Sequence, residues 1–369
     1  MQYKMIAPCY FGTESAAAYD FKRIGAQNVT VTDGRILFEG DEEILCAANL
    51  WSRCAERVLI LLKTGDVLSF DDLFDLTASI PWEELLPADA EFPVKGSSLS
   101  SKLSSVPACQ SIVKKAIVER LRKGHRVQTL PETGALYKIR FSIRKNKAEI
   151  LLDTSGDGLH KRGYRRNSTL APIKETLASA IVDLGRIYPD TMAQDPFCGS
   201  GTLMIEAAMK AMNLAPGLRR RFAAEQYAFI SKKAWAHQRE KALSEIRKDC
   251  TFEGIGFDID PLAVQLASAN AKLAGVEKHC RFFEADVKNF APAKGSMIFT
   301  NPPYGERLGD LQQAAELERI LGQRLEENPV RGAYIITADA DFETHFGKKA
   351  KRRRKLYNGM IPCQVYMYF

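Results

Sequence analysis

The tetrapeptide Asn301-Pro302-Pro303-Tyr304 points to the most specific chemistry in the chain, and it directly follows a predicted strand over 297–300. Two consecutive prolines exclude a helix here and stiffen the loop. An amide oxygen at the strand end can accept a hydrogen bond from the exocyclic amine of a nucleobase, which turns the nitrogen lone pair toward an electrophilic methyl group. A tyrosine ring can stack on a base that has left its helix. The loop therefore predicts methylation of such an amine; a structural β-turn is the alternative.

A glycine turn between a predicted strand and an apolar helix over 203–212 is the second candidate site. Its residues are Asp195, Pro196, Phe197, Cys198, Gly199, Ser200, Gly201 and Thr202. Such turns hold nucleotide-like ligands at the carboxyl ends of strands, because glycine lets the backbone approach without a Cβ. The dinucleotide fingerprint G-x-G-x-x-G is incomplete here, and the carboxylate before the turn suits a ligand with a free ammonium group. A tight strand–helix turn without a ligand is the alternative.

Two further carboxylate segments each follow a predicted strand. Asp258, followed by Ile259 and Asp260, is placed to accept hydrogen bonds from both hydroxyls of a ribose. Its separation from the glycine turn exceeds the usual ~20 residues, which requires an insertion between them. Asp260 precedes a proline and also fits a helix cap, which is the structural alternative. Asp286, next to Val287, follows another predicted strand, where a carboxylate can read an adenine amino group.

The C-terminal region that must position these side chains alternates predicted strands and helices. This alternation is typical of an α/β protein with a doubly wound, mostly parallel sheet and right-handed crossovers. A helix is predicted over 169–184, and strands over 252–257, 279–284, 296–300 and 331–338. Residues 210–250 exceed what a minimal crossover needs, so a helical insertion is predicted there. The segment 356–369 is predicted to end in a final antiparallel strand.

The N-terminal region predicts the order β-α-β-β-α-β, which is that of a small ferredoxin-like unit. Two of its strands are joined by Asp33-Gly34, a strong hairpin signal. The predicted strands cover 3–10, 29–32, 35–39 and 58–62, and the predicted helices cover 14–24 and 41–55. A further helix is predicted over 71–86.

Charge is distributed unevenly along the chain. Residues 1–91 contain 7 Lys and Arg against 16 Asp and Glu, whereas residues 92–168 contain 17 against 5. Seven of the eight positions 348–355 are also basic. Adjacent blocks of opposite sign indicate distinct units, and the basic block favours a polyanionic partner such as RNA or DNA.

Two elements carry the positive charge of the basic block. A helix is predicted over 107–123, and a strand over 136–144 alternates apolar and basic residues, which gives it one buried face and one basic face. The candidate RNA contacts are Lys138, Arg140 and Arg144 on the strand and Lys161, Arg162, Arg165 and Arg166 in the segment that follows. A solvated Lys/Arg face is the alternative.

The chain has 369 residues, 46% hydrophobic and 26% charged, which is usual for globular proteins and predicts two or three domains. Its eight cysteines form no Cys-x-x-Cys pair, so we expect no zinc or other metal site, no disulfide framework, and a cytoplasmic location. Apolar runs are far shorter than the ~20 residues of a membrane helix, and the first residues do not read as a signal peptide. We therefore expect no membrane partner.

Together, the glycine turn and the Asn-Pro-Pro-Tyr loop resemble the class I S-adenosylmethionine-dependent amino-methyltransferases. The stretches 152–166 and 170–177 narrow the resemblance to the THUMP-domain RNA methyltransferases, near the bacterial enzymes that make N2-methylguanine in large-subunit ribosomal RNA. The resemblance implies a ferredoxin-like domain over 1–65, a THUMP-like α+β domain over 66–160, and a Rossmann-like methyltransferase domain over 161–369. It also implies S-adenosyl-L-methionine as the cofactor and RNA, in particular 23S rRNA, as the partner. The oligomeric state is left open.

The resemblance also assigns roles to residues at matching positions. It implies that Asp195, Phe197, Gly199 and Gly201 surround the methionine part of the cofactor, Asp258 the ribose and Asp286 the adenine. It places Leu170, Ala171 and Pro172 along the same pocket, and Asn301, Pro302 and Tyr304 around the target base. Two alternatives stay open. One is an N6-adenine methyltransferase acting on DNA or RNA, since the loop does not separate the two amines; the other is an RNA-binding assembly factor without turnover.

Overall fold

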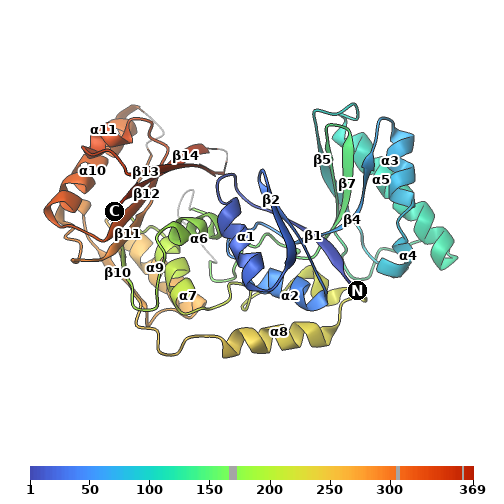
Figure 1. The fold of residues 1–369 in the computed structure, drawn as a ribbon, viewed down its shortest axis with the longest axis horizontal. Helices are drawn as coiled ribbons and strands as arrows, with labels where there is room; N and C mark the ends of the chain where they lie inside the picture. The colour runs from blue at the N-terminus through green and yellow to red at the C-terminus, as the bar shows by residue number, and fades with distance from the viewer. Residues whose placement is uncertain (166–172, 305–307, 360) are drawn as a thin grey trace.

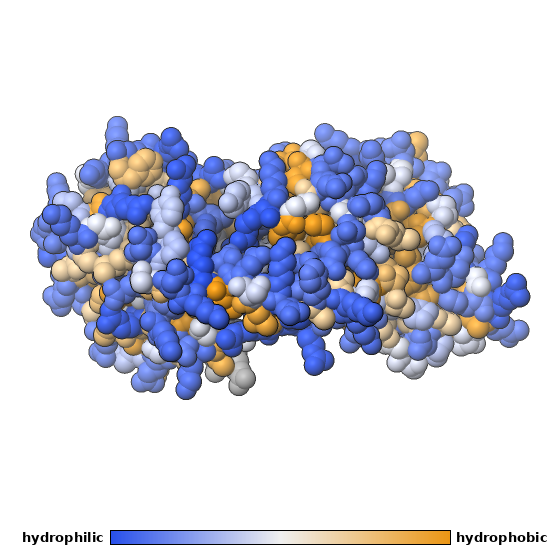
Figure 2. All heavy atoms as spheres, turned by 60° about the horizontal axis from the view of Figure 1, so that its bottom comes forward, coloured by the Kyte–Doolittle hydropathy of each residue, from blue (hydrophilic) through white to orange (hydrophobic). Residues whose placement is uncertain are grey.

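The computed structural model describes residues 1–165, 173–304, 308–359 and 361–369 (Figure 1). These residues form two lobes side by side, each built on one seven-stranded sheet. Hydrophilic residues cover most of the face shown in Figure 2, with apolar residues in scattered patches between them. Among the helices in the described ranges, none is long and apolar enough to cross a membrane.

The N-terminal lobe has the strand order β2-β3-β1-β4-β7-β6-β5. Its strands are β1 (Tyr3–Pro8), β2 (Gln27–Thr32), β3 (Arg35–Gly40), β4 (Leu59–Asp66), β5 (Val94–Leu99), β6 (Ile139–Arg144) and β7 (Lys147–Asp153). Its helices are α1 (Glu14–Arg23), α2 (Glu42–Trp51), α3 (Phe70–Ala78), α4 (Trp82–Leu85) and α5 (Val106–His125). The β-α-β-β-α-β order of the ferredoxin-like unit is confirmed, with β1 lying between β3 and β4.

Strand β4 joins the ferredoxin-like unit and the basic block into one sheet. It pairs with β1 only through Leu59 and Ile60, but with β7 along its whole length. A register shift between Leu61 and Lys63 marks an irregularity in the pairing with β7, and such irregularities increase the local bend of a strand. Because β4 extends beyond residue 65, the boundary predicted between the first two domains falls inside a strand that both share.

The helix predicted over 71–86 is two helices in the structure. α3 ends at Ala78 and α4 begins at Trp82. Pro81 lies between them; it lacks a backbone N–H and disfavours the helical conformation in Ile80 before it. A Ser69 capping box begins α3.

The hairpin built on the alternating basic strand is confirmed. β6 and β7 pair antiparallel, and the two turn residues Lys145 and Asn146 have φ angles of 50° and 64°, as a type I′ turn requires. Ile139, Phe141 and Ile143 are buried under the sheet, so the face that carries the basic residues is the outer one.

The C-terminal lobe is the doubly wound sheet that the sequence predicts, with the order β10-β9-β8-β11-β12-β14-β13. Its strands are β8 (Met192–Asp195), β9 (Glu253–Asp258), β10 (Cys280–Glu284), β11 (Met297–Thr300), β12 (Gly332–Thr337), β13 (Arg352–Asn358) and β14 (Ile361–Tyr368). Its helices are α6 (Glu175–Leu184), α7 (Thr202–Ala211), η1 (Ala223–Gln226), α8 (Lys232–Ser244), α9 (Pro261–Ala274), η2 (Val287–Asn289), α10 (Leu308–Glu327) and α11 (Phe342–Phe346). Strands β8 to β12 are parallel, and β14 runs antiparallel to β12.

The insertion predicted between the first two strands of this lobe contains η1 and α8, and it packs against the N-terminal lobe. The ring of Tyr227 stacks on Tyr137 with centroids 4.3 Å apart, and its hydroxyl donates to the Asp153 carbonyl over 2.5 Å. Phe222 and Trp235 stack within the insertion at 5.2 Å. Figure 1 shows α8 running beneath the N-terminal lobe, where it packs against α2. The insertion of the C-terminal lobe is therefore attached to the N-terminal lobe by stacking and hydrogen bonding.

Candidate active site

The strand order brings the predicted site residues to one edge of the C-terminal sheet. β8 lies between β9 and β11, so the carboxyl ends of these parallel strands are neighbours. Asp195 ends β8, Asp258 ends β9, and Asn301 follows β11. The chain leaves β8 toward β9 on one side and β11 lies on the other, which makes this edge a topological switch point, the usual ligand site of open α/β sheets.

The glycine turn is shaped by conformations and clearances that favour glycine. Gly199 and Gly201 have φ angles of 50° and 80°. A Cβ on Gly201 would lie 2.8 Å from the Phe282 ring. The Cys198 N–H donates to the Phe257 carbonyl over 2.8 Å, which ties the turn to β9. Glycine at position 201 therefore lets the turn pack closely against β10 and α9.

Asp258 braces the glycine turn from the neighbouring strand. Its Oδ2 accepts from the Gly199 N–H at 2.8 Å, and its Oδ1 accepts from the Asp260 N–H at 3.0 Å. The side chain is half-buried, so part of it still faces the crevice. Asp260 caps α9 by accepting from the Leu262 N–H at 2.9 Å, which agrees with the alternative interpretation of that residue. Ile259 is 68% exposed.

Asp195 connects the glycine turn with the catalytic loop. Its buried Oδ1 accepts from the Thr300 hydroxyl at 2.6 Å and from the Phe197 N–H at 3.0 Å. Thr300 is the residue directly before Asn301. Burial raises the pKa of Asp195 to about 7, although both hydrogen bonds act in the opposite direction. A cationic group bound beside this carboxyl would favour its charged form.

A small cavity next to the turn fits the adenine end of the expected ligand. Its volume is about 190 Å³, and Phe257, Val287 and Phe290 line it with apolar surface. Pro196 and Asp286 also line it, so the cavity lies between the glycine turn and the carboxylate that was predicted to read an amino group. Asp286 Oδ1 accepts from the Lys288 N–H at 2.9 Å and thereby begins η2.

The catalytic loop contains a contact that the sequence did not indicate. The Tyr304 hydroxyl donates to Asn301 Oδ1 over 2.5 Å, so the amide oxygen expected to accept the substrate amine is occupied by tyrosine in this structure. Burial raises the pKa of Tyr304 strongly. Pro302 is buried and Pro303 is exposed. The tyrosine hydroxyl uses one of the two lone pairs of the amide oxygen, so a second acceptor position remains for a base that enters the loop.

Four of the predicted contacts lie outside the described residues: Arg166, Leu170, Ala171 and Pro172. On β6, Arg140 is held by the fully buried Asp153 at 3.0 Å, and Lys138 donates to the Gly156 carbonyl at 3.3 Å. Arg144 is exposed at the end of the strand. The strand therefore presents less free positive charge than its sequence suggests.

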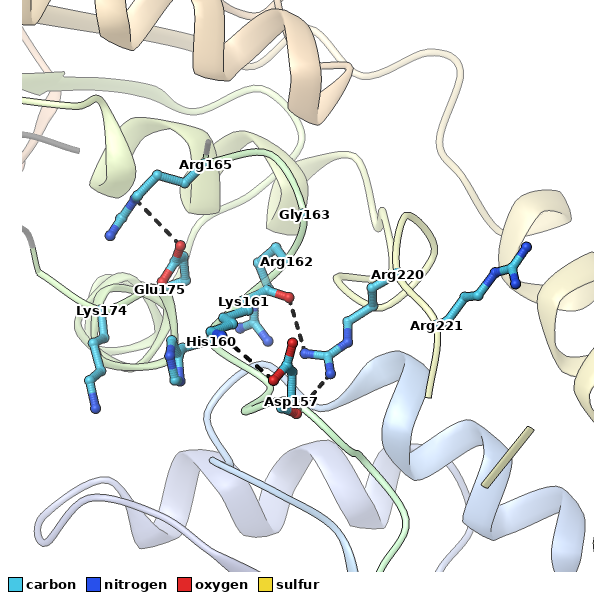
Figure 3. Close-up of a pocket in the computed structure, with 10 residues that line it drawn as sticks. All are labelled: Asp157, His160, Lys161, Arg162, Gly163, Arg165, Lys174, Glu175, Arg220 and Arg221. Carbon is cyan, nitrogen blue, oxygen red and sulfur yellow. Dashed lines mark hydrogen bonds and ion pairs between the residues drawn. The ribbon is translucent and has the colours of Figure 1, made fainter. Parts of the chain in front are cut away.

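A basic cavity of about 800 Å³ lies where the segment after β7 meets the start of α6 and the insertion (Figure 3). The cavity is lined by Asp157, His160, Lys161, Arg162, Gly163, Arg165, Lys174, Glu175, Arg220 and Arg221. Lys161 is exposed, whereas Arg165 donates to the Thr202 hydroxyl at 2.6 Å and is close to Glu175. The cavity therefore connects the predicted RNA-binding segment with the first turn of α7.

One of the predicted RNA contacts, Arg162, is buried in the structure. It is 3% exposed, and its guanidinium donates to the carbonyls of Leu159 at 2.7 Å and Ser52 at 3.3 Å, and to that of Arg53. Because burial and these carbonyls occupy the guanidinium, it cannot meet a phosphate at the surface. Arg162 instead ties the segment after β7 to the end of α2, next to α7.

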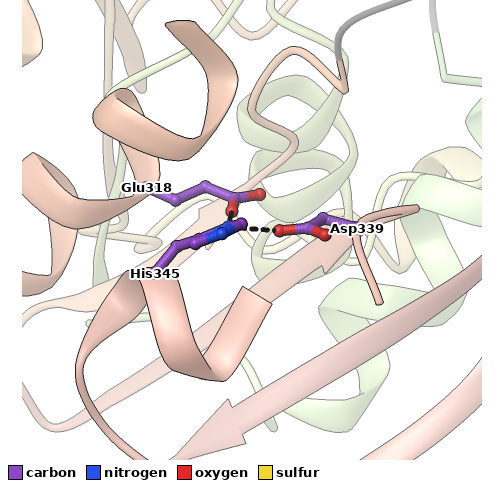
Figure 4. Close-up of side chains that lie close together, drawn as sticks. All are labelled: Glu318, Asp339 and His345. Atoms are coloured by element: carbon purple, nitrogen blue, oxygen red, sulfur yellow. Dashed lines mark hydrogen bonds and ion pairs between the residues drawn. The ribbon is translucent and has the colours of Figure 1, made fainter. Parts of the chain in front are cut away.

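Glu318, Asp339 and His345 form a group that the sequence analysis missed, because they lie on α10, after β12 and on α11 (Figure 4). Their donor atoms all lie within 4.8 Å of one another, and two carboxylates with an imidazole suit a divalent metal ion. His345 Nδ1 is 2.7 Å from Asp339 and 3.4 Å from Glu318. Burial raises the pKa of Glu318 to about 8.

Comparison with protein families assigns all three parts of the chain. Residues 162–367 match the family described as RMKL-like, methyltransferase domain (UPF0020). Residues 4–59 match the RlmL ferredoxin-like domain, and residues 68–153 match the THUMP domain.

Among curated proteins, the chain is 41% identical to YpsC of Bacillus subtilis, whose name provisionally makes it an RNA methyltransferase; the match covers 100% of the chain and 96% of YpsC. It is 34% identical, over 98% of its length, to the ribosomal RNA large subunit methyltransferase K/L of Syntrophotalea carbinolica. The chain spans only 53% of that relative, about half.

Three solved structures resemble the whole chain. One is described as a possible methylase from Clostridium difficile 630, with a TM-score of 0.96, 40% identity, and coverage of 100% of this chain and 98% of that one. Another, a methyltransferase candidate complexed with SAH, has a TM-score of 0.94, 36% identity, and coverage of 100% and 98%. A third is named a predicted N6-adenine-specific DNA methylase from Listeria monocytogenes. Its TM-score is 0.95 and its sequence identity 41%, and the match covers 100% of this chain and 96% of that one.

Proposed function

Because the chain belongs to the RMKL-like methyltransferase family, we propose that it transfers a methyl group to an exocyclic amine of an RNA nucleobase, most specifically N2 of a guanine in 23S rRNA. One observation carries the proposal. Asp195 of the glycine turn accepts a hydrogen bond from Thr300, the residue before Asn301. The candidate donor site and the candidate acceptor loop are thus held on adjacent strands by a direct contact.

The residues of the turn suit S-adenosylmethionine, which supplies an activated methyl on a sulfonium. The buried Asp195 carboxyl is placed for a ligand ammonium, and Asp258 for ribose hydroxyls. The apolar cavity beside Asp286 is placed for the adenine. The positive φ angles of Gly199 and Gly201 form the tight turn between β8 and α7 that nucleotide folds use at this position.

On the acceptor side, this chain's residues position the amine. The Asn301 amide oxygen accepts one N–H of the base through the lone pair that Tyr304 leaves free, and the Tyr304 ring can stack on the extruded base. The amine nitrogen forms the new N–C bond while the S–C bond breaks and its electron pair stays on sulfur. The proton that the nitrogen loses goes to solvent. Alignment of the amine with the methyl group, not acid–base chemistry, supplies most of the rate enhancement.

RNA as the substrate is supported by the THUMP match, by the basic block and by the names of YpsC and the K/L relatives. The position N2 of guanine rests on the resemblance of the motifs to enzymes that make N2-methylguanine. N6 of adenine is the competing target, and one structural relative is named for it.

A deletion strain tests the target. We expect mass analysis of nucleosides from its 23S rRNA to show loss of N2-methylguanine at one position, restored by the wild-type chain but not by Asn301→Ala. Unchanged N2-methylguanine together with lost N6-methyladenine would move the target to adenine.

A further inference from the structure

A rigid turn presents an aromatic ring at the junction of the two lobes. Thr13 donates to the Tyr10 carbonyl with both its N–H, at 3.0 Å, and its hydroxyl, at 2.8 Å. Glu14 accepts from the Gly12 N–H at 2.8 Å and from the Gly34 N–H at 3.1 Å. Between these anchors, Phe11 is 52% exposed. A large apolar ring is therefore held in a fixed position and left half open to solvent.

This turn is fitted against β13 of the other lobe. Gly12 has a φ of +86°, and a Cβ there would lie 2.5 Å from the Lys355 carbonyl oxygen. Arg354 donates to the Gly12 carbonyl at 2.9 Å. The rings of Phe11 and Tyr357 meet edge to face with centroids 6.4 Å apart. Figure 1 shows the β13–β14 hairpin reaching toward α1, so the aromatic pair combines one ring from each lobe.

The aromatic pair lies close to the catalytic loop. Tyr304 packs against the apolar cluster that includes Leu356 on β13 and Cys363 on β14. Leu356 and Cys363 pair across the hairpin, and Leu356 directly precedes Tyr357. A nucleotide next to a base held by Asn301 would therefore reach this hairpin.

Positive charge accompanies the aromatic rings. Lys355 Nζ is 5.9 Å from the Tyr357 ring centroid, and Lys174 Nζ is 5.5 Å from the Tyr10 ring. Lys355 is exposed. Aromatic rings interleaved with cations are the usual surface for single-stranded nucleic acid, since every base has a face that can stack and every nucleotide has a phosphate.

Resting on the proposed function, we propose that Phe11 and Tyr357 form a stacking platform for a nucleotide that flanks the target base in single-stranded RNA, with Lys355 at its phosphate. Part of the Phe11 edge already contacts Tyr357, and the exposed half of the ring supplies the free surface. The hydrogen bonds of the turn fix the ring beforehand, which lowers the ordering cost of binding.

The test measures binding of a single-stranded oligouridylate that carries one 5-iodouridine, which photo-crosslinks to a stacked aromatic side chain. The oligouridylate contains no guanine or adenine, so its result does not depend on the methylated base. We expect crosslinks at Phe11 or Tyr357. Phe11→Ala and Tyr357→Ala should each weaken binding about 5- to 150-fold, as loss of one stacked base does.

Tyr19→Ala is the matched control, because Tyr19 is 64% exposed on α1 of the same unit. It should leave the affinity unchanged. Phe11→Leu should bind the oligouridylate as weakly as Phe11→Ala does. Both variants should keep the wild-type unfolding temperature and the wild-type affinity for S-adenosylmethionine. Wild-type binding by Phe11→Leu, crosslinks confined to β6 and β7, or dissociation of a dimer by Phe11→Ala would each overturn the proposal.

Discussion

The hydrogen bond between Tyr304 and Asn301 sets how the catalytic loop works at the level of single residues. The sequence placed an amide at the end of β11, but it did not show that the tyrosine three residues later would occupy that amide. Local spacing cannot reveal this contact, because it depends on the loop conformation that the two prolines impose. The tyrosine hydroxyl therefore holds the amide oxygen in place and leaves its second lone pair for a substrate amine.

Asn301→Ala should lower the rate of methyl transfer by about 10²–10³, because loss of one preorganised hydrogen bond at a reacting centre has that effect. The unfolding temperature and S-adenosylmethionine affinity should stay near wild type, since Asn301 is half-buried in a loop. Single-turnover kinetics with saturating cofactor measure this. A wild-type rate would remove Asn301 from the role of amine acceptor.

Asp258→Ala should weaken S-adenosylmethionine binding, because a hydrogen bond to a charged acceptor contributes about 1.5–3 kcal/mol. The structure adds a second effect: the Gly199 N–H loses its partner, so the turn itself loosens. Asp258→Asn keeps an acceptor for Gly199 and should bind better than Asp258→Ala. Calorimetric titration of both variants checks the order; equal affinity to wild type would place the ribose elsewhere.

Asp195 makes the stability of the ligand-free protein depend on pH. The folded carboxyl keeps its proton up to about pH 7, whereas the unfolded one loses it near its ordinary pKa of 3.8. The folded state therefore binds more protons between these values, and the free energy of unfolding should fall as pH rises from about 4 to 7.

Asp195→Asn should reduce this fall while also weakening cofactor binding, because a neutral amide does not titrate and does not attract an ammonium group. Thermal unfolding at pH 5 and pH 8 compares the two proteins. Identical pH dependence in both would show that Asp195 is ionised throughout.

At the scale of elements, periodicity predicted best those strands and helices that bury one apolar face. The strict alternation over 136–144 predicted β6, whose buried residues are Ile139, Phe141 and Ile143. The division between α3 and α4 at Pro81 was missed, although proline was its signal. The continuity of β4 across both N-terminal units was not accessible, since strand pairing joins segments far apart in sequence.

The outer face of β6 should bind RNA phosphates through fewer residues than its sequence suggests. Lys138→Ala and Arg144→Ala should each reduce the slope of log affinity against log salt by roughly 0.7–0.9 for every phosphate that the side chain neutralises in the wild-type protein. Arg140 is held by Asp153 and is best left unchanged. Lys4→Ala, at a side chain 73% exposed on β1, serves as the control. Unchanged slopes would make this face ordinary solvated surface.

At the scale of the whole molecule, buried arginines and the insertion fix one lobe against the other. Arg53 donates to the carbonyls of Met209 and Leu214 next to α7, while Arg162 donates to the carbonyls around Ser52. In the sequence, Arg162 is only one member of a basic run, and charge alone does not show that a side chain is buried. These hydrogen bonds join the end of α2 to α7 and to the segment after β7.

Arg162→Ala should destabilise the protein by about 1–3 kcal/mol or more, since buried carbonyls lose their donors. For this variant, the slope of log RNA affinity against log salt concentration should equal that of wild type, because the guanidinium is not at the surface. Chemical denaturation and salt titrations distinguish the two effects. A reduced slope with normal stability would restore Arg162 as a phosphate contact.

The most direct test of a methyl-transfer site shared by the glycine turn and the Asn301 loop is a reaction with purified components. Methyl-labelled S-adenosylmethionine and 23S rRNA from the deletion strain are incubated with the wild-type chain or Asn301→Ala, and the labelled nucleoside is identified by mass spectrometry. We expect N2-methylguanosine as the labelled product with the wild-type chain and almost no labelled product with Asn301→Ala. Label in N6-methyladenosine, or equal label with both proteins, would contradict it.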